Sequence, residues 1–144
     1  MELKLNKQAR WSKKHLDFLI KHKDAYGIDI SEDSYNNEIS NINRGQATLR
    51  CRENQKCYEI YNEEAYIGDI VLEEDNEISI IIFDEYSGKG HAYNAISLLI
   101  KEEKINYLEA VVRPSNQNKN IKKLLSKLGF VNKNEVWVFK KDLY

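Results

Sequence analysis

Residues 78–100 read ISIIIFDEYSGKGHAYNAISLLI, and this stretch decides the fold. From Ile78 to Phe83 the chain is almost continuously apolar, which predicts a largely buried strand. From Ala92 to Ile100 apolar residues recur three and four positions apart, which predicts an amphipathic helix. The turn between them carries Gly88 and Gly90. The stretch therefore predicts a strand, a glycine-bearing loop and a helix in succession.

This loop has the features of a phosphate-binding turn. The first N–H groups of a helix have no acceptor within the helix, and the helix dipole adds partial positive charge there. Because Gly88 and Gly90 lack side chains, a bulky anion can approach the backbone, and Lys89 can add a charge. A simpler alternative stays open, in which the two glycines only form a tight turn between strand and helix.

The spacing of the glycines separates three phosphate-binding motifs. A P-loop would need Gly at Phe83 and Ser or Thr at Gly90. A dinucleotide fingerprint would put its third glycine at Tyr93, and the chain lacks a run of parallel βαβ units. The pyrophosphate loop of acyl-CoA-dependent transferases, Arg/Gln-x-x-Gly-x-Gly/Ala, fits best, because Gly90 and Ala92 occupy its two small-residue positions.

The remaining sequence predicts further helices and strands around this stretch. A helix with Trp11, Leu16 and Phe18 among polar residues ends at Gly27, and Ser31 can cap a second helix. Strands are predicted at Glu2–Asn6, Thr48–Arg50, Cys57–Tyr61, Ala65–Leu72 and Tyr107–Val112. A later helix carries Ile121, Leu124, Leu125 and Leu128 on one stripe before Gly129, and residues 130–144 predict a hairpin that turns at Lys133–Asn134.

Composition limits the class of protein. The chain has 144 residues, of which 42% are hydrophobic and 31% charged, which predicts one globular domain over residues 1–144. With 22 Lys and Arg against 23 Asp and Glu, no nucleic-acid partner is indicated by net charge. No apolar run approaches the about 20 residues of a membrane span, and the first ten residues lack a secretory pattern. We therefore expect a cytoplasmic protein with no membrane partner.

The cysteines and histidines do not suggest a metal site. Cys51 and Cys57 are the only cysteines, and no matching Cys or His pair stands at zinc-ligand spacing. We interpret them as reduced thiols on neighbouring strand positions. His15 and His22 lie one heptad apart on the charged first helix, and we interpret this as a solvated helix face. We expect no metal cofactor.

The chain resembles the GNAT superfamily of acyl-CoA-dependent N-acetyltransferases, in particular the branch that contains the ribosomal-protein N-terminal acetyltransferases. The resemblance covers most of the chain. It rests on residues 85–92, EYSGKGHA, and on residues 113–118, RPSNQN, which lead to residues 127–130, KLGF. It implies an α/β (α+β) fold with a mixed, mostly antiparallel sheet flanked by helices. It also implies acetyl-CoA as cosubstrate and a primary amine as acceptor.

The resemblance assigns roles to particular residues. It places acetyl-CoA against Ile82, Phe83, Ser87, Gly88, Lys89, Gly90, His91, Ala92, Tyr93, Asn116 and Asn118. In the family two central strands splay, and backbone N–H groups freed there hold the pantetheine and the developing oxyanion. Glu77 stands where some members place a catalytic glutamate, which makes it the candidate general base; Asp84 and Glu85 are lesser candidates. Ser87 replaces the family's usual Arg or Gln.

Two further departures concern the proton for the leaving thiolate. Ile121 stands where many members have Ser, and Leu125 where many have the Tyr that is proposed to protonate the sulfur. Two interpretations stay open. Either another group or solvent supplies the proton, or the protein is a non-catalytic acyl-CoA sensor or partner-binding domain. A nucleotide-binding regulatory domain is a third alternative.

The acceptor amine must be neutral before it can react. Deprotonating a lysine at pH 7 costs about 4.6 kcal/mol, whereas an α-amine costs about 1.4 kcal/mol. A site with few catalytic groups therefore suits a peptide or protein N-terminus, or a small amine of low pKa. The expected partners are an acyl-CoA and such an amine, and the expected state is a monomer or homodimer.

Overall fold

The computed structural model describes residues 1–114, 116 and 120–141. Its elements follow in the order β1 (Glu2–Leu5), α1 (Lys13–Lys21), α2 (Lys23–Tyr26), α3 (Glu32–Asn43), β2 (Lys56–Asn62), β3 (Ala65–Leu72), β4 (Ile78–Ile82), the 3₁₀ turn η1 (Asp84–Tyr86), α4 (His91–Glu102), β5 (Tyr107–Val111), α5 (Asn120–Leu128), β6 (Val131–Lys133) and β7 (Val136–Lys140). In the described part of the chain, no helix is long and apolar enough to cross a membrane.

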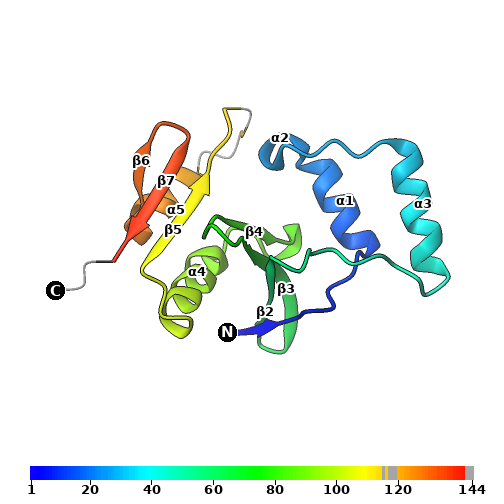
Figure 1. The fold of residues 1–144 in the computed structure, drawn as a ribbon, viewed down its shortest axis with the longest axis horizontal. Helices are drawn as coiled ribbons and strands as arrows, with labels where there is room; N and C mark the ends of the chain where they lie inside the picture. Colours follow the sequence, from blue (N-terminus) through cyan, green and yellow to red (C-terminus); the bar gives the residue numbers. More distant parts are fainter. Residues whose placement is uncertain (115, 117–119, 142–144) are drawn as a thin grey trace.

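The strands form two antiparallel sheets. The first has the order β1-β2-β3-β4, and the second has the order β5-β7-β6. Figure 1 shows α1, α2 and α3 at one end of the molecule and the β5–β7 sheet with α5 at the other. The first sheet and α4 lie between them. The predicted mixture of helices and mostly antiparallel strands is confirmed.

The two sheets meet where the chain enters β4, beside the middle of β5. Glu77 and Glu109 form an isolated parallel bridge there, and the Glu109 N–H donates to the Asn76 carbonyl at 3.0 Å. From this point the strands run in the same direction but belong to different sheets, since β4 pairs with β3 and β5 pairs with β7. The two strands are thus joined through Glu77 and Glu109 and have separate partners beyond these residues.

Two clusters of buried side chains hold this arrangement. The larger one fills the space between the sheets, α4 and α5, with Ile60, Leu99 and Leu108 fully buried at its centre. The smaller one packs Phe18 and Leu19 of α1 against Phe83 at the end of β4. The predicted burial of the strand from Ile78 to Phe83 is confirmed for Ile78 and Phe83 themselves. Between them the isoleucines are half-buried and Ser79 is exposed, because β4 lies at the edge of its sheet.

Most predicted local signals are confirmed, with one exception. Gly27 and Gly129 adopt the positive φ expected at helix ends, and the Ser31 hydroxyl caps α3 by accepting from the Ser34 N–H at 3.1 Å. The predicted strand Thr48–Arg50 is wrong. That run contributes one isolated bridge, between Leu49 and Arg10, since Thr48 and Leu49 are exposed and hydrophobic burial does not fix a register.

Candidate functional site

The glycine loop follows β4 directly and opens α4. Its first residues form η1, and the Ser87 hydroxyl closes this turn by donating to the Asp84 carbonyl at 2.9 Å. Ser87 therefore shapes the loop with its short side chain. Gly88 and Gly90 have φ values of 74° and 78°, which L side chains rarely adopt. Gly90 is the N-cap of α4, and having no side chain it cannot accept from the first N–H groups of the helix.

The space around these N–H groups is open. A Cβ added at Gly88 or Gly90 would meet nothing within 4 Å, and residues 87–90 are exposed. His91, Ala92 and Tyr93 form the first turn of α4, so their backbone N–H groups are the ones that a helix leaves without internal acceptors. Helix geometry and open space together suit the approach of a phosphate group, which is the chemistry predicted for this loop.

The start of the loop is held by α1. Asp84 accepts from Lys21 Nζ at 2.7 Å and interacts with His22 Nε2 at 2.9 Å, and Glu85 forms an ion pair with Lys14. The hydrogen bond from Lys21 holds the pKa of Asp84 below its ordinary value. Asp84 and Glu85 thus serve to attach the loop to α1, and the contacts leave them poorly placed as general bases.

The two strand residues predicted to face the cosubstrate differ in their backbone bonds. The Phe83 N–H donates to the Ile67 carbonyl at 2.9 Å, so it is not one of the freed strand N–H groups that the resemblance implies for the contact with the cosubstrate. Backbone groups alternate between the two edges of a strand, and those of Ile80 and Ile82 therefore point away from β3. A contact on that side agrees with this, because the Ile80 carbonyl accepts from the Tyr26 hydroxyl at 2.6 Å. The backbone groups of Ile82 therefore face the side of β4 opposite to β3, and its contact with the cosubstrate stays a prediction.

Residues 113–118, the second segment on which the resemblance rests, follow β5 in the sequence. The Asn116 N–H donates to the Arg113 carbonyl at 3.0 Å, which closes a turn after the strand, while Asn118 lies outside the described residues. On α5, Leu125 is only 2% exposed and belongs to the core. Lys127 from α5 lies 4.5 Å from the centre of the Tyr93 ring on α4, which brings positive charge beside the glycine loop.

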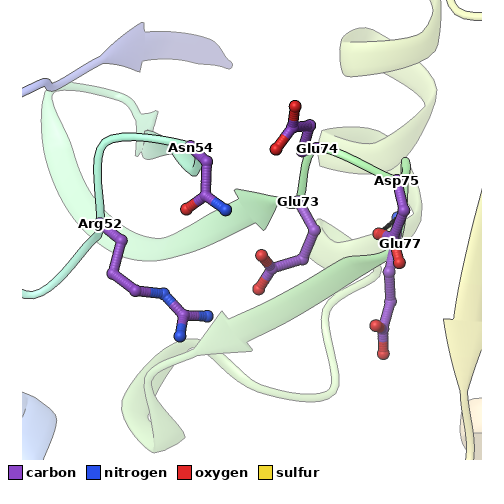
Figure 2. Close-up of a pocket in the computed structure, with 6 residues that line it drawn as sticks. All are labelled: Arg52, Asn54, Glu73, Glu74, Asp75 and Glu77. Atoms are coloured by element: carbon purple, nitrogen blue, oxygen red, sulfur yellow. Dashed lines mark hydrogen bonds between the residues drawn. The ribbon is translucent and has the colours of Figure 1, made fainter.

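Glu77 lies at the joined end of β4 and lines an open cavity of about 510 Å³. The cavity is also lined by Arg52, Asn54, Glu73, Glu74 and Asp75, and Figure 2 shows these side chains. Glu73 and Glu77 point to the same side, whereas Glu74 points to the other. Burial and the neighbouring carboxylates Asp75, Glu73 and Glu109 raise the pKa of Glu77, which is the direction that a general base at neutral pH requires.

A second cavity, of about 230 Å³, lies between the first helices and the sheet. Its lining is mostly apolar and includes Trp11, Leu19, Tyr26, Ile28, Val71 and Ile81, with Arg50, Cys51, Gln55, Glu73 and Ser79 as its polar part. Glu73 lines both cavities and accepts from Gln55 Nε2 at 2.7 Å. The acidic cavity and the apolar cavity therefore adjoin at Glu73.

A buried polar network around His15 and Asp69 was not predicted from the sequence. His15 is 3% exposed, so the prediction of a solvated face is wrong for it. Its Nε2 lies 2.7 Å from Asp69 Oδ2, and its Nδ1 lies 2.6 Å from the Ser12 hydroxyl. Asp69 also accepts from the Tyr66 hydroxyl at 2.6 Å and from Arg50. The signal was Asp69 itself, because a lone carboxylate in the apolar run Ala65–Leu72 needs buried partners.

The two cysteines lie in different environments. Cys57 is buried in β2, whereas Cys51 precedes the strand and lines the apolar cavity, so the two are not on neighbouring strand positions. Both are free thiols. Among residues 1–114, 116 and 120–141, no group of three or more His, Cys, Asp or Glu side chains is arranged to hold a metal ion.

Comparison with known proteins gives matches in structure but not in sequence. No family model and no curated protein matches the chain. A ribosomal-protein alanine acetyltransferase from Vibrio fischeri superposes with a TM-score of 0.63 at 14% identity, over 98% of this chain and 93% of that one. A variant spermidine N-acetyltransferase from Vibrio cholerae gives 0.60 at 16% identity, over 97% and 95%. The N-acetyltransferase PseH from Campylobacter jejuni with acetyl coenzyme A gives 0.56 at 15% identity, over 99% and 100%. The chain therefore has the fold of the GNAT acetyltransferases.

Proposed function

We propose that the protein is an N-acetyltransferase that moves an acetyl group from acetyl-CoA to a primary amine. The observation that carries this proposal is the placement of the unblocked helix start at residues 91–93 directly beyond the edge of β4 that faces away from β3. The first feature suits the diphosphate of CoA, and the second offers backbone partners for its pantetheine amides. The fold and the neighbour that carries acetyl coenzyme A support the same reading.

The acceptor would enter from the apolar cavity. Ser79 and Ile81 of β4 line this cavity, so an amine held there meets the strand along which the thioester would lie. A volume of about 230 Å³ fits a small amine or the first residue of a peptide or protein N-terminus. The amine nitrogen forms a bond to the thioester carbon, the carbon–sulfur bond breaks, the amine loses one proton to a base, and CoA leaves as its thiol after taking one proton.

Binding and turnover can be tested separately. We expect calorimetry to show that CoA and acetyl-CoA bind and that ATP binds at least tenfold more weakly. We expect thiol release from acetyl-CoA when a panel of amines and N-terminal peptides is added. Stronger binding of ATP would contradict the proposal. CoA binding without thiol release for any acceptor would favour the alternative acyl-CoA sensor, which the apolar Leu125 supports.

Glu77 is proposed as the general base that takes the proton from the acceptor amine. We expect Glu77→Gln to lower kcat at pH 7 about tenfold, which is below the usual contribution of a general base because an α-amine needs little help. A base acts when deprotonated, so the wild-type rate should rise with pH through the raised pKa of Glu77, and this acidic limb should vanish in the variant. The measurement is the pH–rate profile under saturating acetyl-CoA.

Glu74→Gln is the matched control for this experiment. Glu74 lines the same cavity and carries the same charge, but its side chain points away from Glu77. A general loss of negative charge would change the rates of both variants alike. An unchanged profile in Glu77→Gln, or an equal change in both variants, would exclude Glu77 as the base.

A further inference from the structure

One tyrosine reaches the edge of β4 that faces away from β3, and it comes from the helical side. Tyr26 ends α2, and its ring packs 5.8 Å from the ring of Phe18 between α1 and the sheet. Its hydroxyl donates to the Ile80 carbonyl at 2.6 Å, and its ring lines the apolar cavity. Phe18, Leu19 and Phe83 form the buried cluster against which Tyr26 packs.

The contact with Ile80 places this hydroxyl in the path of the proposed cosubstrate. If the diphosphate lies at residues 88–93, beyond the end of β4, the pantetheine arm must return along the edge that carries Ile82 and then Ile80. The thioester at the tip of the arm then lies beside the middle of the strand. Tyr26 meets the strand at this point, and the acceptor cavity opens there as well.

The reaction needs a hydrogen-bond donor at this point. As the carbon–sulfur bond breaks, negative charge develops on sulfur, and a donor aimed at it lowers the barrier. Leu125 and Ile121 have no donor groups. Tyr66 also packs against Phe83, at 5.5 Å between ring centres, but its hydroxyl donates to Asp69. The Tyr26 hydroxyl bonds a strand-edge carbonyl that a pantetheine amide could take over.

We propose that Tyr26 is a catalytic residue whose hydroxyl donates a hydrogen bond to the thioester sulfur as it leaves. This inference rests on the proposed acetyl transfer. The bond between the acetyl carbon and sulfur breaks with its electron pair on sulfur, which accepts the hydrogen bond from Tyr26. The thiolate then takes its proton from solvent water, and the proton lost by the amine goes to Glu77.

The proton stays on the tyrosine oxygen for an energetic reason. Burial, together with the charge of Asp84, raises the pKa of Tyr26 above its ordinary value near 10. A thiol has a pKa of about 8.5, so complete transfer from Tyr26 to the thiolate would be uphill. A hydrogen bond to the charged sulfur without transfer is therefore the stable arrangement. Tyr26 also remains a neutral donor throughout the working pH range.

Titration of bound CoA tests the inference without any acceptor. The thiolate of CoA absorbs in the ultraviolet, and we expect the thiol of CoA bound to wild type to titrate at lower pH than in solution. In Tyr26→Phe the titration should move up by about one pH unit or more, since hydrogen bonds to charged groups are strong. With a competent acceptor, kcat should fall about tenfold, while the Kd for CoA at neutral pH should change less than twofold.

Tyr35→Phe is the control, because it removes the same atom from a half-buried tyrosine of α3, whose hydroxyl donates to the exposed Asp17 at 2.7 Å. We expect its titration and kcat to match wild type. If Tyr26→Phe binds CoA and leaves the titration of the thiol unchanged, the inference is overturned even though the proposed function stands. If wild type does not bind CoA, the proposed function itself fails. Melting curves of both variants show whether packing, rather than the hydrogen bond, causes a change in rate.

Discussion

Replacing Gly90 with glutamate is expected to weaken CoA binding at least a hundredfold while the chain stays folded. The added carboxylate would stand at the N-cap of α4, where the diphosphate is proposed to lie. Two unit charges about 4 Å apart near a protein surface interact by about 4 kcal/mol, and part of this survives screening by salt. The side chain would also accept from the first N–H groups of the helix and compete with the phosphate for them. Calorimetry with CoA measures the loss.

Gly45→Glu is the matched control for this variant. Gly45 has φ 70° against 78° for Gly90, and an added Cβ meets nothing within 4 Å at either position. Both variants therefore carry the same charge change and the same backbone strain, of about 1 kcal/mol. We expect both to lose similar stability and only Gly90→Glu to lose CoA affinity. Normal binding in Gly90→Glu, or equal losses in both, would show that the diphosphate lies elsewhere.

The part of the fold around the glycine loop was predictable because its signals are local. A run of isoleucines, glycines at positive φ and apolar residues at helical spacing are read within a few residues. The same holds for the Ser31 cap and for Gly129, whose backbone conformations follow from the residue itself. Thr48–Arg50 lacks such support. Its β propensity is real, but among the described residues the run pairs through a single bridge with Arg10, so propensity alone misleads.

The contacts of the site were predictable only where they involve the backbone. The N–H groups at the start of α4 follow from helix geometry, whatever the side chains are. Tyr26 lies 54 residues from its acceptor Ile80, and His15 lies 54 residues from Asp69. Neither pair leaves a periodic or spaced pattern in the sequence. The bond between Phe83 and Ile67 is similar, because it depends on the register of β3 against β4.

Asp69→Ala is expected to destabilise the protein by about 3–5 kcal/mol, the usual cost of removing one partner from a buried charged network. Asp69 is 1% exposed, and its loss leaves His15, Arg50 and Tyr66 without their shared acceptor. Because the network ties α1 to β3, the loss also loosens the helix that holds the start of the glycine loop. The measurement is the free energy of unfolding from urea titration, with wild type measured in parallel.

The pH dependence of this effect has a definite sign. Burial alone would raise the pKa of Asp69, but the hydrogen bond from His15, the charge of Arg50 and the hydrogen bond from Tyr66 together hold it below its ordinary value. A carboxylate with a lowered pKa in the folded state stabilises that state above its unfolded pKa of about 3.9. This contribution disappears as the pH falls through that value toward the lowered one. The stability difference between wild type and Asp69→Ala should therefore shrink on acidification.

Asp17→Ala separates this buried network from ordinary surface ion pairing. Asp17 binds Lys13 and Tyr35 at the exposed side of α1, where a pair is worth about 0.5 kcal/mol or less. We expect this variant to unfold close to wild type at every pH. If Asp69→Ala were as stable as Asp17→Ala, Asp69 would not hold the early helix to the sheet. The shape of the apolar cavity, which Leu19 of α1 lines together with Val71 of β3, would then not depend on this network.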